Sequence, residues 1–304
     1  MTPICPACKA DKTSLSKDAG RPPYRFYECG ECRLVFSNPM QPVNGRWYSR
    51  QAMYVVRDNF GTGELQWNHR QFLKDLPAAG GRLLDVGCGT GEFLAAARQA
   101  GYLVSGFDFD AEAVKTARQR TGINEITTGD LAQFSGKERT RRFDVVTAFE
   151  VLEHSPEPDR FLASLTELIA PNGYLAISVP DRERRPRIRY DWDFPPNHLT
   201  RWSRGSLAHI IQRNGLRIVR MESGWRQGEP LLHQTLQFGL VTRLMGAGSP
   251  SGGGRGVSRH AASTAYKVKS AAVKILAVPV NLGLSAIGAT GMTLYLLAQK
   301  NNVN

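Results

Sequence analysis

The feature that most constrains the fold of this chain is a glycine-rich turn between an apolar run and a helical pattern. Residues 83–93 read Leu-Leu-Asp-Val-Gly-Cys-Gly-Thr-Gly-Glu-Phe. Glycines at the end of a buried strand let the backbone approach a ligand closely, because no Cβ is in the way. Nucleotide-binding dehydrogenases use a similar turn. Here, however, Asp85 makes the turn acidic, which disfavours a pyrophosphate and favours an ammonium group.

From Gly81 onward, short β-like runs alternate with helical patterns. Strands are expected over 82–86, 102–107, 125–128, 143–148, 174–179 and 216–222, and helices over 91–100, 111–121, 158–170 and 205–214. Such alternation predicts parallel strands joined by right-handed helical crossovers. The sequence therefore indicates an α/β domain with a Rossmann-like sheet.

Two further acidic residues follow the next strands of this pattern. Asp108 lies 17 residues after Gly91, about where a carboxylate receives ribose hydroxyls in nucleotide-binding βαβ units. Asp130 follows the third strand, where it could accept a hydrogen bond from an adenine amino group. The cofactor expected here therefore carries a nucleoside.

Five segments in order, DVGCGTG, GFDFD, TGD, FDVVTAFEVLEH and APNGYLAISVP, resemble the motifs of class I S-adenosylmethionine-dependent methyltransferases over residues 80–222. The resemblance implies a seven-stranded sheet with helices on both faces. It assigns Asp85, Gly87, Gly89 and Gly91 to the methionine end of the cofactor and Asp108 to the ribose. Phe109, Asp130 and Leu131 would frame the adenine, and Cys88 and Phe149 would line the same site, Cys88 as a small loop residue. The alternative is an NAD-binding domain.

The fourth strand leads into a Glu-x-x-Glu-His segment formed by Glu150, Glu153 and His154. The carboxyl ends of parallel strands face the ligand crevice, so these side chains should line an active site. His154 could accept a proton from an acceptor hydroxyl, or it could simply support the following loop. Ubiquinone-pathway O-methyltransferases carry a similar segment, and that resemblance implies a divalent cation such as Mg²⁺ bound by the three residues. The same segment also occurs in related methyltransferases with no known metal.

Residues 181–203 should form a lid over the methyl acceptor. His198 stands among the aromatic residues Trp192, Phe194 and Trp202, a mixture that suits a ring-shaped or apolar acceptor. The alternative is that His198 only bonds backbone near the turn at 195–196. The segment is similar to one in methyltransferases of bacterial polysaccharide and secondary-metabolite pathways. Five arginines at 182, 184, 185, 187 and 189 form either a solvated face or a site for a phosphate group.

Two Cys-x-x-Cys pairs near the N-terminus, Cys5 with Cys8 and Cys29 with Cys32, predict a zinc ribbon over residues 1–40. Four thiolates complete a tetrahedral Zn²⁺ site and leave no open position for catalysis, so the zinc should be structural. The segment resembles ribbons of sugar-type methyltransferases, where they help shape the acceptor site. Ribbons also occur on methyltransferases of ribosomal RNA, although this one is nearly neutral and lacks a basic aromatic stripe.

The remaining segments complete the predicted organisation. Residues 41–80 should form a helical cap or linker, 81–245 the methyltransferase core, 246–270 a flexible Gly/Ser-rich basic loop, and 271–304 an apolar helix and the last strand of the sheet. The uncharged run at 275–298 is long enough for a membrane span, but Pro279 and several glycines interrupt it. Basic residues before this run make peripheral contact with anionic lipid a second interpretation.

Bulk properties narrow the function only a little. The net charge of +12 favours anionic partners without choosing among them. Paired cysteines and the absence of a signal-like start favour a cytoplasmic location, with the inner membrane face as the alternative. We therefore expect methyl transfer from S-adenosylmethionine to a hydroxyl of a small-molecule, sugar or lipid-linked acceptor. The alternatives are an RNA methyltransferase and a non-catalytic scaffold that binds the cofactor.

Overall fold

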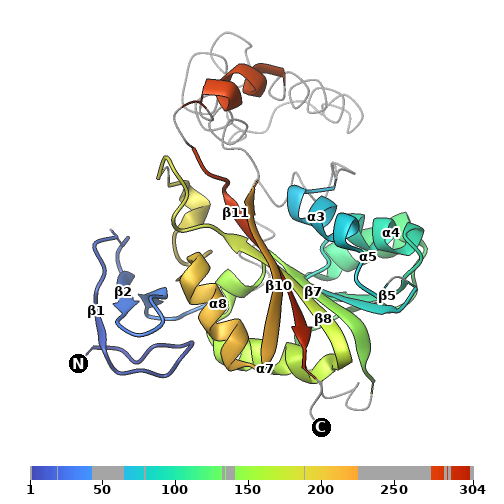
Figure 1. The fold of residues 1–304 in the computed structure, drawn as a ribbon, viewed down its shortest axis with the longest axis horizontal. Helices are drawn as coiled ribbons and strands as arrows, with labels where there is room; N and C mark the ends of the chain where they lie inside the picture. The colour runs from blue at the N-terminus through green and yellow to red at the C-terminus, as the bar shows by residue number, and fades with distance from the viewer. Residues whose placement is uncertain are drawn as a thin grey trace, which may run out of the picture. The chain divides into compact units, whose positions relative to one another are not determined.

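Two sheets organise the described part of the chain, and the larger one carries the glycine-rich turn. The computed structural model describes residues 2–18, 20–42, 65–78, 80–131, 134, 141–187, 189–224, 275–283, 286 and 289–301. Seven strands form the larger sheet in the order β10-β11-β8-β7-β4-β5-β6 (Figure 1). They are β4 (Arg82–Val86), β5 (Leu103–Asp108), β6 (Ile126–Thr128), β7 (Phe143–Phe149), β8 (Ile169–Pro180), β10 (Leu216–Gly224) and β11 (Thr293–Lys300).

The strand directions confirm the predicted Rossmann-like fold. Strands β4 to β8 pair in parallel, whereas β11 runs antiparallel to both β8 and β10. The chain order reverses at β4, because β5 and β6 extend the sheet to one side and β7 and β8 to the other. In open α/β sheets, ligands bind at this switch point, outside the carboxyl ends of the strands. The glycine-rich turn follows β4 at that place.

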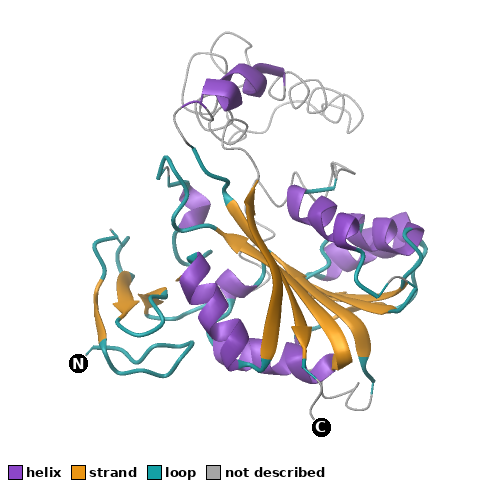
Figure 2. Ribbon diagram, in the orientation of Figure 1, coloured by secondary structure: helices purple, strands orange, loops and turns teal. Residues whose placement is uncertain are grey.

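Helices cover both faces of the sheet (Figure 2). One buried cluster joins the strands to α7 (Pro158–Leu168) and α8 (Arg204–Arg213), and a second joins them to α3 (Trp67–Asp75), α4 (Glu92–Gln99) and α5 (Ala111–Thr121). Alternation along a strand divides its side chains between the two cores. In β4, for example, Leu83 belongs to one cluster and Leu84 to the other.

Local signals explain several helix ends. The side chain of Asp110 caps α5 by accepting from the backbone N–H of Glu112 at 3.0 Å, and Gly122 ends the helix at φ 65°. The predicted helix at 158–170 stops at Leu168, because β8 begins at the next residue. Strand β8 is also longer than the predicted 174–179, and its register with β7 shifts between Phe143 and Val145.

The smaller sheet joins the N-terminal segment to the lid. Its strands are β1 (Thr13–Leu15), β2 (Arg25–Cys29), β3 (Val35–Asn38) and β9 (Thr200–Arg201), in the order β1-β2-β3-β9. Strand β9 comes from the predicted acceptor lid, and Thr200 pairs with Phe36 of β3. Leu34 and Phe36 lie in the same buried cluster as α7 and α8. The N-terminal segment thus shares a core with the large sheet.

The chain divides into two compact units. The sheets described above belong to the first unit, and the second contains Arg184–Tyr190 and Trp225–Met292. Within the second unit, the backbone of Arg185 exchanges hydrogen bonds with Thr290, at 2.8 Å to the side chain and 2.9 Å to the backbone N–H. None of the helices that the structure describes has the length and apolar character needed to cross a bilayer.

Several predictions fall outside the described residues. They concern most of the helical cap or linker at 41–80, the Gly/Ser-rich loop at 246–270, and the basic residues that precede the apolar run. Part of the cap lies inside the described ranges, as helix α3.

Candidate functional site

The glycine-rich turn has the backbone that its sequence predicts. Gly87, Gly89 and Gly91 all have positive φ, at 76°, 52° and 82°. Such left-handed conformations favour glycine, since a Cβ would clash with the neighbouring carbonyl. At Gly87 a Cβ would also lie 2.6 Å from Cγ2 of Val151. The turn therefore keeps a tight path that other residues would not allow.

Asp85 ends β4 beneath this turn and is almost fully buried. The hydroxyl of Thr147, on β7, donates to Asp85 Oδ1 at 2.6 Å. The pKa of Asp85 is raised to about 7. Burial is the main cause, the Thr147 hydrogen bond acts in the opposite direction, and the charge of the nearby Asp108 adds to the rise. A carboxyl group that titrates near neutral pH at a ligand crevice is suited to respond to a cationic ligand.

Asp108 is the last residue of β5 and is buried beside the turn. It accepts from the backbone N–H of Gly89 at 2.9 Å and from that of Asp110 at 2.9 Å. A carboxylate oxygen has two lone pairs, so it can accept from more than one donor. The turn after β4 and the end of β5 are thereby tied together.

The other predicted cofactor residues follow the same edge of the sheet. Phe109, directly after Asp108, is 49% exposed. Asp130 and Leu131 follow β6, next to Gly129, whose N–H donates to the backbone oxygen of Asp108 at 3.0 Å. Cys88 is buried in the turn, and its Sγ would lie 3.2 Å from a Cβ placed at Gly106. That contact requires a small neighbour on β5.

Phe149, at the end of β7, packs in an aromatic cluster. Its ring centroid lies 5.0 Å from that of Phe93 on α4 and 5.2 Å from that of His69 on α3. Burial lowers the pKa of His69 to about 4, so its imidazole is neutral at physiological pH. The cluster joins α3 and α4 to the end of β7.

Glu150 follows β7 directly and has a left-handed backbone, with φ 56°. The hydroxyl of Ser178 donates to Glu150 Oε1 at 2.9 Å, and the side-chain amide of Asn68 donates to Ser178 Oγ at 2.8 Å. A non-glycine residue with positive φ is uncommon and marks a site held in place by its surroundings. This network joins α3, β7 and β8.

Glu153 and His154 lie on the short helix η1 (Leu152–His154), and His198 from the lid approaches them. Glu153 Oε1 lies 3.8 Å from His154 Nε2 and 3.9 Å from His198 Nε2. The two imidazole centroids are 4.9 Å apart. The structure thus brings together three of the four predicted catalytic residues, from segments far apart in the chain.

The surroundings of this cluster set its protonation. Burial, with the carboxylates of Glu150 and Asp193 nearby, raises the pKa of Glu153 well above its usual range. Burial lowers the pKa of His154 to about 4. The backbone oxygen of Asn197 lies 2.7 Å from His154 Nδ1, and since a carbonyl only accepts, we assign the proton to Nδ1. Nε2 of His154 then presents its lone pair towards Glu153.

Charged pairs attach the lid to the N-terminal segment. Arg201 is buried, and its Nη1 lies 3.2 Å from Asp18 Oδ2, while Arg182 Nη2 lies 3.3 Å from Glu28 Oε1. Arg182 also donates to the backbone oxygen of Arg33 at 2.9 Å. Of the predicted arginine run, Arg182 therefore contacts the N-terminal segment and does not form a solvated face.

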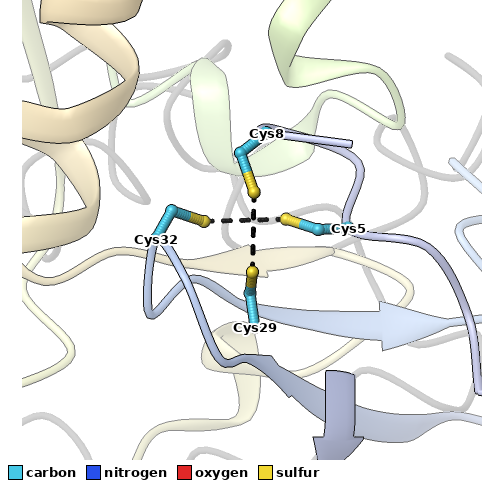
Figure 3. Close-up of side chains that lie close together, drawn as sticks. All are labelled: Cys5, Cys8, Cys29 and Cys32. Atoms are coloured by element: carbon cyan, nitrogen blue, oxygen red, sulfur yellow. Dashed lines mark hydrogen bonds between the residues drawn. The ribbon is translucent and has the colours of Figure 1, made fainter. Parts of the chain in front are cut away.

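The four cysteines of the N-terminal segment converge on one point (Figure 3). Sγ of Cys5 lies 3.6 Å from that of Cys32, and Sγ of Cys8 lies 3.5 Å from that of Cys29. These separations are far too long for disulfides. Four Zn–S bonds of about 2.3 Å at tetrahedral angles would place the sulfurs about 3.8 Å apart, so the arrangement fits zinc.

Sequence reasoning missed several residues of this region. His69 and Asn68 lie in the segment that we predicted only as a helical cap, where no motif marks them. Thr147 stands inside β7 and looks like an ordinary strand residue. Asp193, on η2 (Asp191–Asp193), lies 4.0 Å from His198 Nδ1 and could have been found from the acidic DWD triplet of the lid.

Comparisons with known proteins agree with this geometry. A family described as "Methyltransferase domain" matches residues 62–221. The "Ubiquinone biosynthesis O-methyltransferase" of Proteus mirabilis is 34% identical over 148 residues, which cover 48% of this chain and 59% of that protein. The mitochondrial enzyme of the same name from Schizosaccharomyces pombe is 33% identical over 114 residues, covering 36% of this chain and 42% of that one. The chain spans about half the length of these curated relatives.

Solved structures show the same fold. A SAM-dependent methyltransferase from Archaeoglobus fulgidus superposes with a TM-score of 0.53 at 18% identity, covering 82% of this chain and 100% of that one. Phosphoethanolamine N-methyltransferase 2 from Haemonchus contortus superposes with a TM-score of 0.55 at 15% identity, covering 88% of this chain and 62% of that one.

Proposed function

This chain belongs to the methyltransferase domain family, and on that premise we propose that it transfers a methyl group from S-adenosylmethionine to a hydroxyl oxygen. The acceptor would be a small molecule, a sugar or a lipid-linked compound. One observation carries the proposal. Asp85, three left-handed glycines and Asp108 meet at the switch point of the sheet, where a ligand with a cationic end and a ribose would bind.

Each predicted cofactor residue has a role in this proposal. Asp85 and the turn from Gly87 to Gly91 hold the methionine end, because the buried carboxyl favours an ammonium group. Asp108 accepts from the ribose hydroxyls. Phe109, Asp130 and Leu131 frame the adenine at the end of β5 and after β6, and Phe149 closes the crevice beside His69. Cys88 serves as a small loop residue.

In this reaction the protein has two tasks, to position the reactants and to accept a proton. The bound cofactor would supply an electrophilic methyl group on a sulfonium sulfur: the acceptor oxygen attacks the methyl carbon in line, the C–S bond breaks with its electron pair going to sulfur, and S-adenosylhomocysteine leaves. The chain holds the two reactants in that alignment, which provides much of the rate acceleration. Glu153, His154 and His198 would accept the proton of the hydroxyl, or stabilise the negative charge that its loss leaves on the oxygen. Glu150 acts as a positioning residue through Ser178.

Two features support a hydroxylated ring or a lipid-linked compound as acceptor. The relatives named above are O-methyltransferases of ubiquinone biosynthesis. In addition, Phe194 and Trp192 of the lid lie within a few residues of Asp193 and His198, so aromatic and polar groups occur together. Arg182 is engaged with Glu28, so a phosphate on the acceptor would have to be recognised by other arginines of the lid.

Zn²⁺ is the second cofactor that we propose, bound by Cys5, Cys8, Cys29 and Cys32. All four Sγ atoms lie close enough to one another to bind a single ion. With four thiolates the site is closed, so its role is structural. It would join the knuckle before β1, Cys5–Cys8, to the knuckle at the end of β2, Cys29–Cys32.

Mg²⁺ at the Glu-x-x-Glu-His segment fits less well. Glu150 Oε1 accepts from Ser178, and Glu150 does not belong to the group of ligand atoms that lie within 4.8 Å of one another among the described residues. No step of the proposed reaction is therefore assigned to an ion held by Glu150, Glu153 and His154.

Peripheral contact with an anionic membrane is part of the same proposal, with the cytoplasm as the predicted location. Ile275, Leu276, Val278 and Leu282 are exposed on the apolar segment at 275–283. No acidic residue follows Glu229 in the sequence, so the C-terminal part is purely basic. Basic residues in the sequence together with exposed apolar side chains suit acidic lipid head groups.

The acceptor class can be tested with S-adenosylmethionine carrying a labelled methyl group. The protein would be incubated with a cell extract that is then separated into small-molecule, lipid and RNA fractions. We expect the label in the small-molecule or lipid fraction, resistant to ribonuclease. Label confined to RNA, with tight and steeply salt-dependent RNA binding, would contradict the proposal and favour the RNA alternative. Cofactor binding with no labelled product in any fraction would favour a non-catalytic scaffold.

A further inference from the structure

Glu153 is an unusual residue in the interior of this protein. Its carboxylate is 1% exposed, and neither oxygen has a hydrogen-bond partner among the described residues. A buried carboxyl without a partner is costly, and native structures rarely keep one without a reason. The surroundings add to the cost, because Glu150 and Asp193 contribute further negative charge.

Two imidazoles face the same oxygen of this carboxylate. Nε2 of His154 and Nε2 of His198 lie 3.8 and 3.9 Å from Glu153 Oε1. These distances are too long for direct hydrogen bonds, which end near 3.2 Å. One ion bound to all three atoms through bonds of about 2.1 Å would hold them about 3.4 Å apart at tetrahedral angles, so each imidazole nitrogen would need to approach Glu153 Oε1 by about 0.4–0.5 Å.

We infer that Glu153, His154 and His198 form a binding site for a divalent first-row transition metal ion, such as Mn²⁺, Fe²⁺, Co²⁺ or Zn²⁺. This ligand set differs from the Glu150, Glu153 and His154 set that the motif resemblance implies. His198 replaces Glu150, whose carboxylate bonds to Ser178. The site uses one ligand from the lid and two from η1.

The donor atoms determine which metals fit. Two imidazole nitrogens and one carboxylate oxygen suit Mn²⁺, Fe²⁺, Co²⁺ and Zn²⁺, whereas Mg²⁺ prefers an octahedron of oxygen ligands. The outer contact of His154 is also of the kind that metal-binding histidines have. Its Nδ1 lies 2.7 Å from the backbone oxygen of Asn197, and such a partner orients an imidazole ligand. Asp193 Oδ1 lies 4.0 Å from His198 Nδ1, which is beyond hydrogen-bond distance.

A catalytic role for this metal site rests on the proposed methyl transfer. A metal ion beside an acceptor hydroxyl favours the ionised oxygen, so the cluster would act as an ion-bearing unit, with the imidazoles serving as ligands. Binding of the ion is nevertheless independent of the cofactor. The two proposals can therefore fail separately.

Mn²⁺ binding to the zinc-loaded full chain tests the site directly. The fall in the electron paramagnetic resonance signal of free Mn²⁺ gives the stoichiometry and affinity. Zn²⁺ at the four cysteines should not be displaced, since thiolates favour zinc over manganese. We expect about one Mn²⁺ per chain. Glu153→Gln and His198→Gln should weaken binding at least about tenfold, because even the loss of an outer partner costs that much.

Glu150→Gln is the matched control. Glutamine keeps an oxygen for the Ser178 hydroxyl and removes only one nearby negative charge, so Mn²⁺ affinity should fall less than in Glu153→Gln and His198→Gln. Loss of binding in Glu150→Gln with retention in His198→Gln would overturn our ligand set in favour of the one that the motif implies. The absence of Mn²⁺ binding by a folded, zinc-loaded chain would overturn the site itself.

A second readout identifies the ligands without any variant. The chain has six histidines, and their imidazole signals can be followed by nuclear magnetic resonance in labelled protein. Substoichiometric Mn²⁺ should broaden the signals of His154 and His198 selectively. Uniform or absent broadening would contradict the proposal. Titration with S-adenosylhomocysteine on the same sample reports separately on the proposed function.

Discussion

At the scale of single residues, Asp85 links the fold to the proposed cofactor. Its carboxyl is buried at the end of β4, and its pKa is raised from 3.8 to about 7. The raised pKa means that the folded state favours the neutral form. This contribution to stability is complete below the unfolded pKa and is lost as pH rises through about 7. A bound ammonium group would reverse that preference, because it favours the ionised carboxylate.

The affinity for S-adenosylhomocysteine should therefore depend on pH. We expect the dissociation constant to rise by up to about tenfold per pH unit below 7, because the carboxyl must lose its proton to pair with the ligand. Calorimetric titration at pH 6, 7 and 8 measures this. Asp85→Asn should bind weakly and lose the pH dependence, whereas Asp144→Asn, at the amino end of β7, should keep it. If the affinity of the unmodified chain does not change between pH 6 and pH 8, this role of Asp85 is contradicted.

The residues of the cofactor crevice were predictable because their signals are local. Asp85, Gly87 and Gly91 stand within one short segment, and Asp108 ends the next strand, so strand order alone brings them together. The cluster at Glu153 was only half predictable. Its two halves, η1 and the lid, come from separate motifs, and nothing in their spacing shows that His198, and not Glu150, would complete a group with Glu153 and His154.

At the scale of elements, the two-residue strand β9 connects the N-terminal segment to the candidate site. Leu199, just before it, receives a hydrogen bond at its carbonyl from Ser37 N–H at 2.8 Å and donates its own N–H to the Glu153 carbonyl at 2.8 Å. The side chain of Arg201 reinforces this link through Asp18 and packs over the ring of Phe26 at 3.9 Å. His198 therefore directly precedes a residue whose backbone is fixed by hydrogen bonds on both sides.

Removing the charge of Asp18 should loosen the lid locally. In Asp18→Asn, we expect amide hydrogen exchange over residues 191–203 to accelerate about tenfold, since a charged hydrogen bond contributes about 1–3 kcal/mol and 1.4 kcal/mol is a factor of ten. Glu157→Gln, which removes an exposed pair with Arg160, should change exchange little. Unchanged exchange in the lid of Asp18→Asn would show that Arg201 holds its place without this pair.

The elements differ in how well the sequence predicts them. The strands of the large sheet are apolar runs between clear turns, and all seven were expected. Strand β9 is too short to show any periodicity, so its pairing with β3 could not be seen. The same holds for the ribbon core, because its apolar side chains are few and become a core only by joining those of α7 and α8.

At the scale of the whole molecule, the four-cysteine cluster, the two ends of the lid and the large sheet belong to one compact unit with a shared buried cluster. The second unit groups the middle of the lid, Arg184–Tyr190, with the segment at 225–292. Sequence patterns did not predict that grouping, because it depends on contacts between distant segments of weak periodicity. The family and the seven-stranded Rossmann-like sheet were, by contrast, predictable from five motifs in sequence.

We propose above all that this chain binds the methyl-donor cofactor at the end of β4. Calorimetric titration of the zinc-loaded chain with S-adenosylhomocysteine, together with zinc quantification of the same sample, tests it most directly. We predict one ligand and about one zinc per chain, a dissociation constant in the micromolar range, and at least about tenfold weaker binding by Asp108→Asn. Absence of binding by a folded, zinc-loaded chain would contradict the proposed cofactor site.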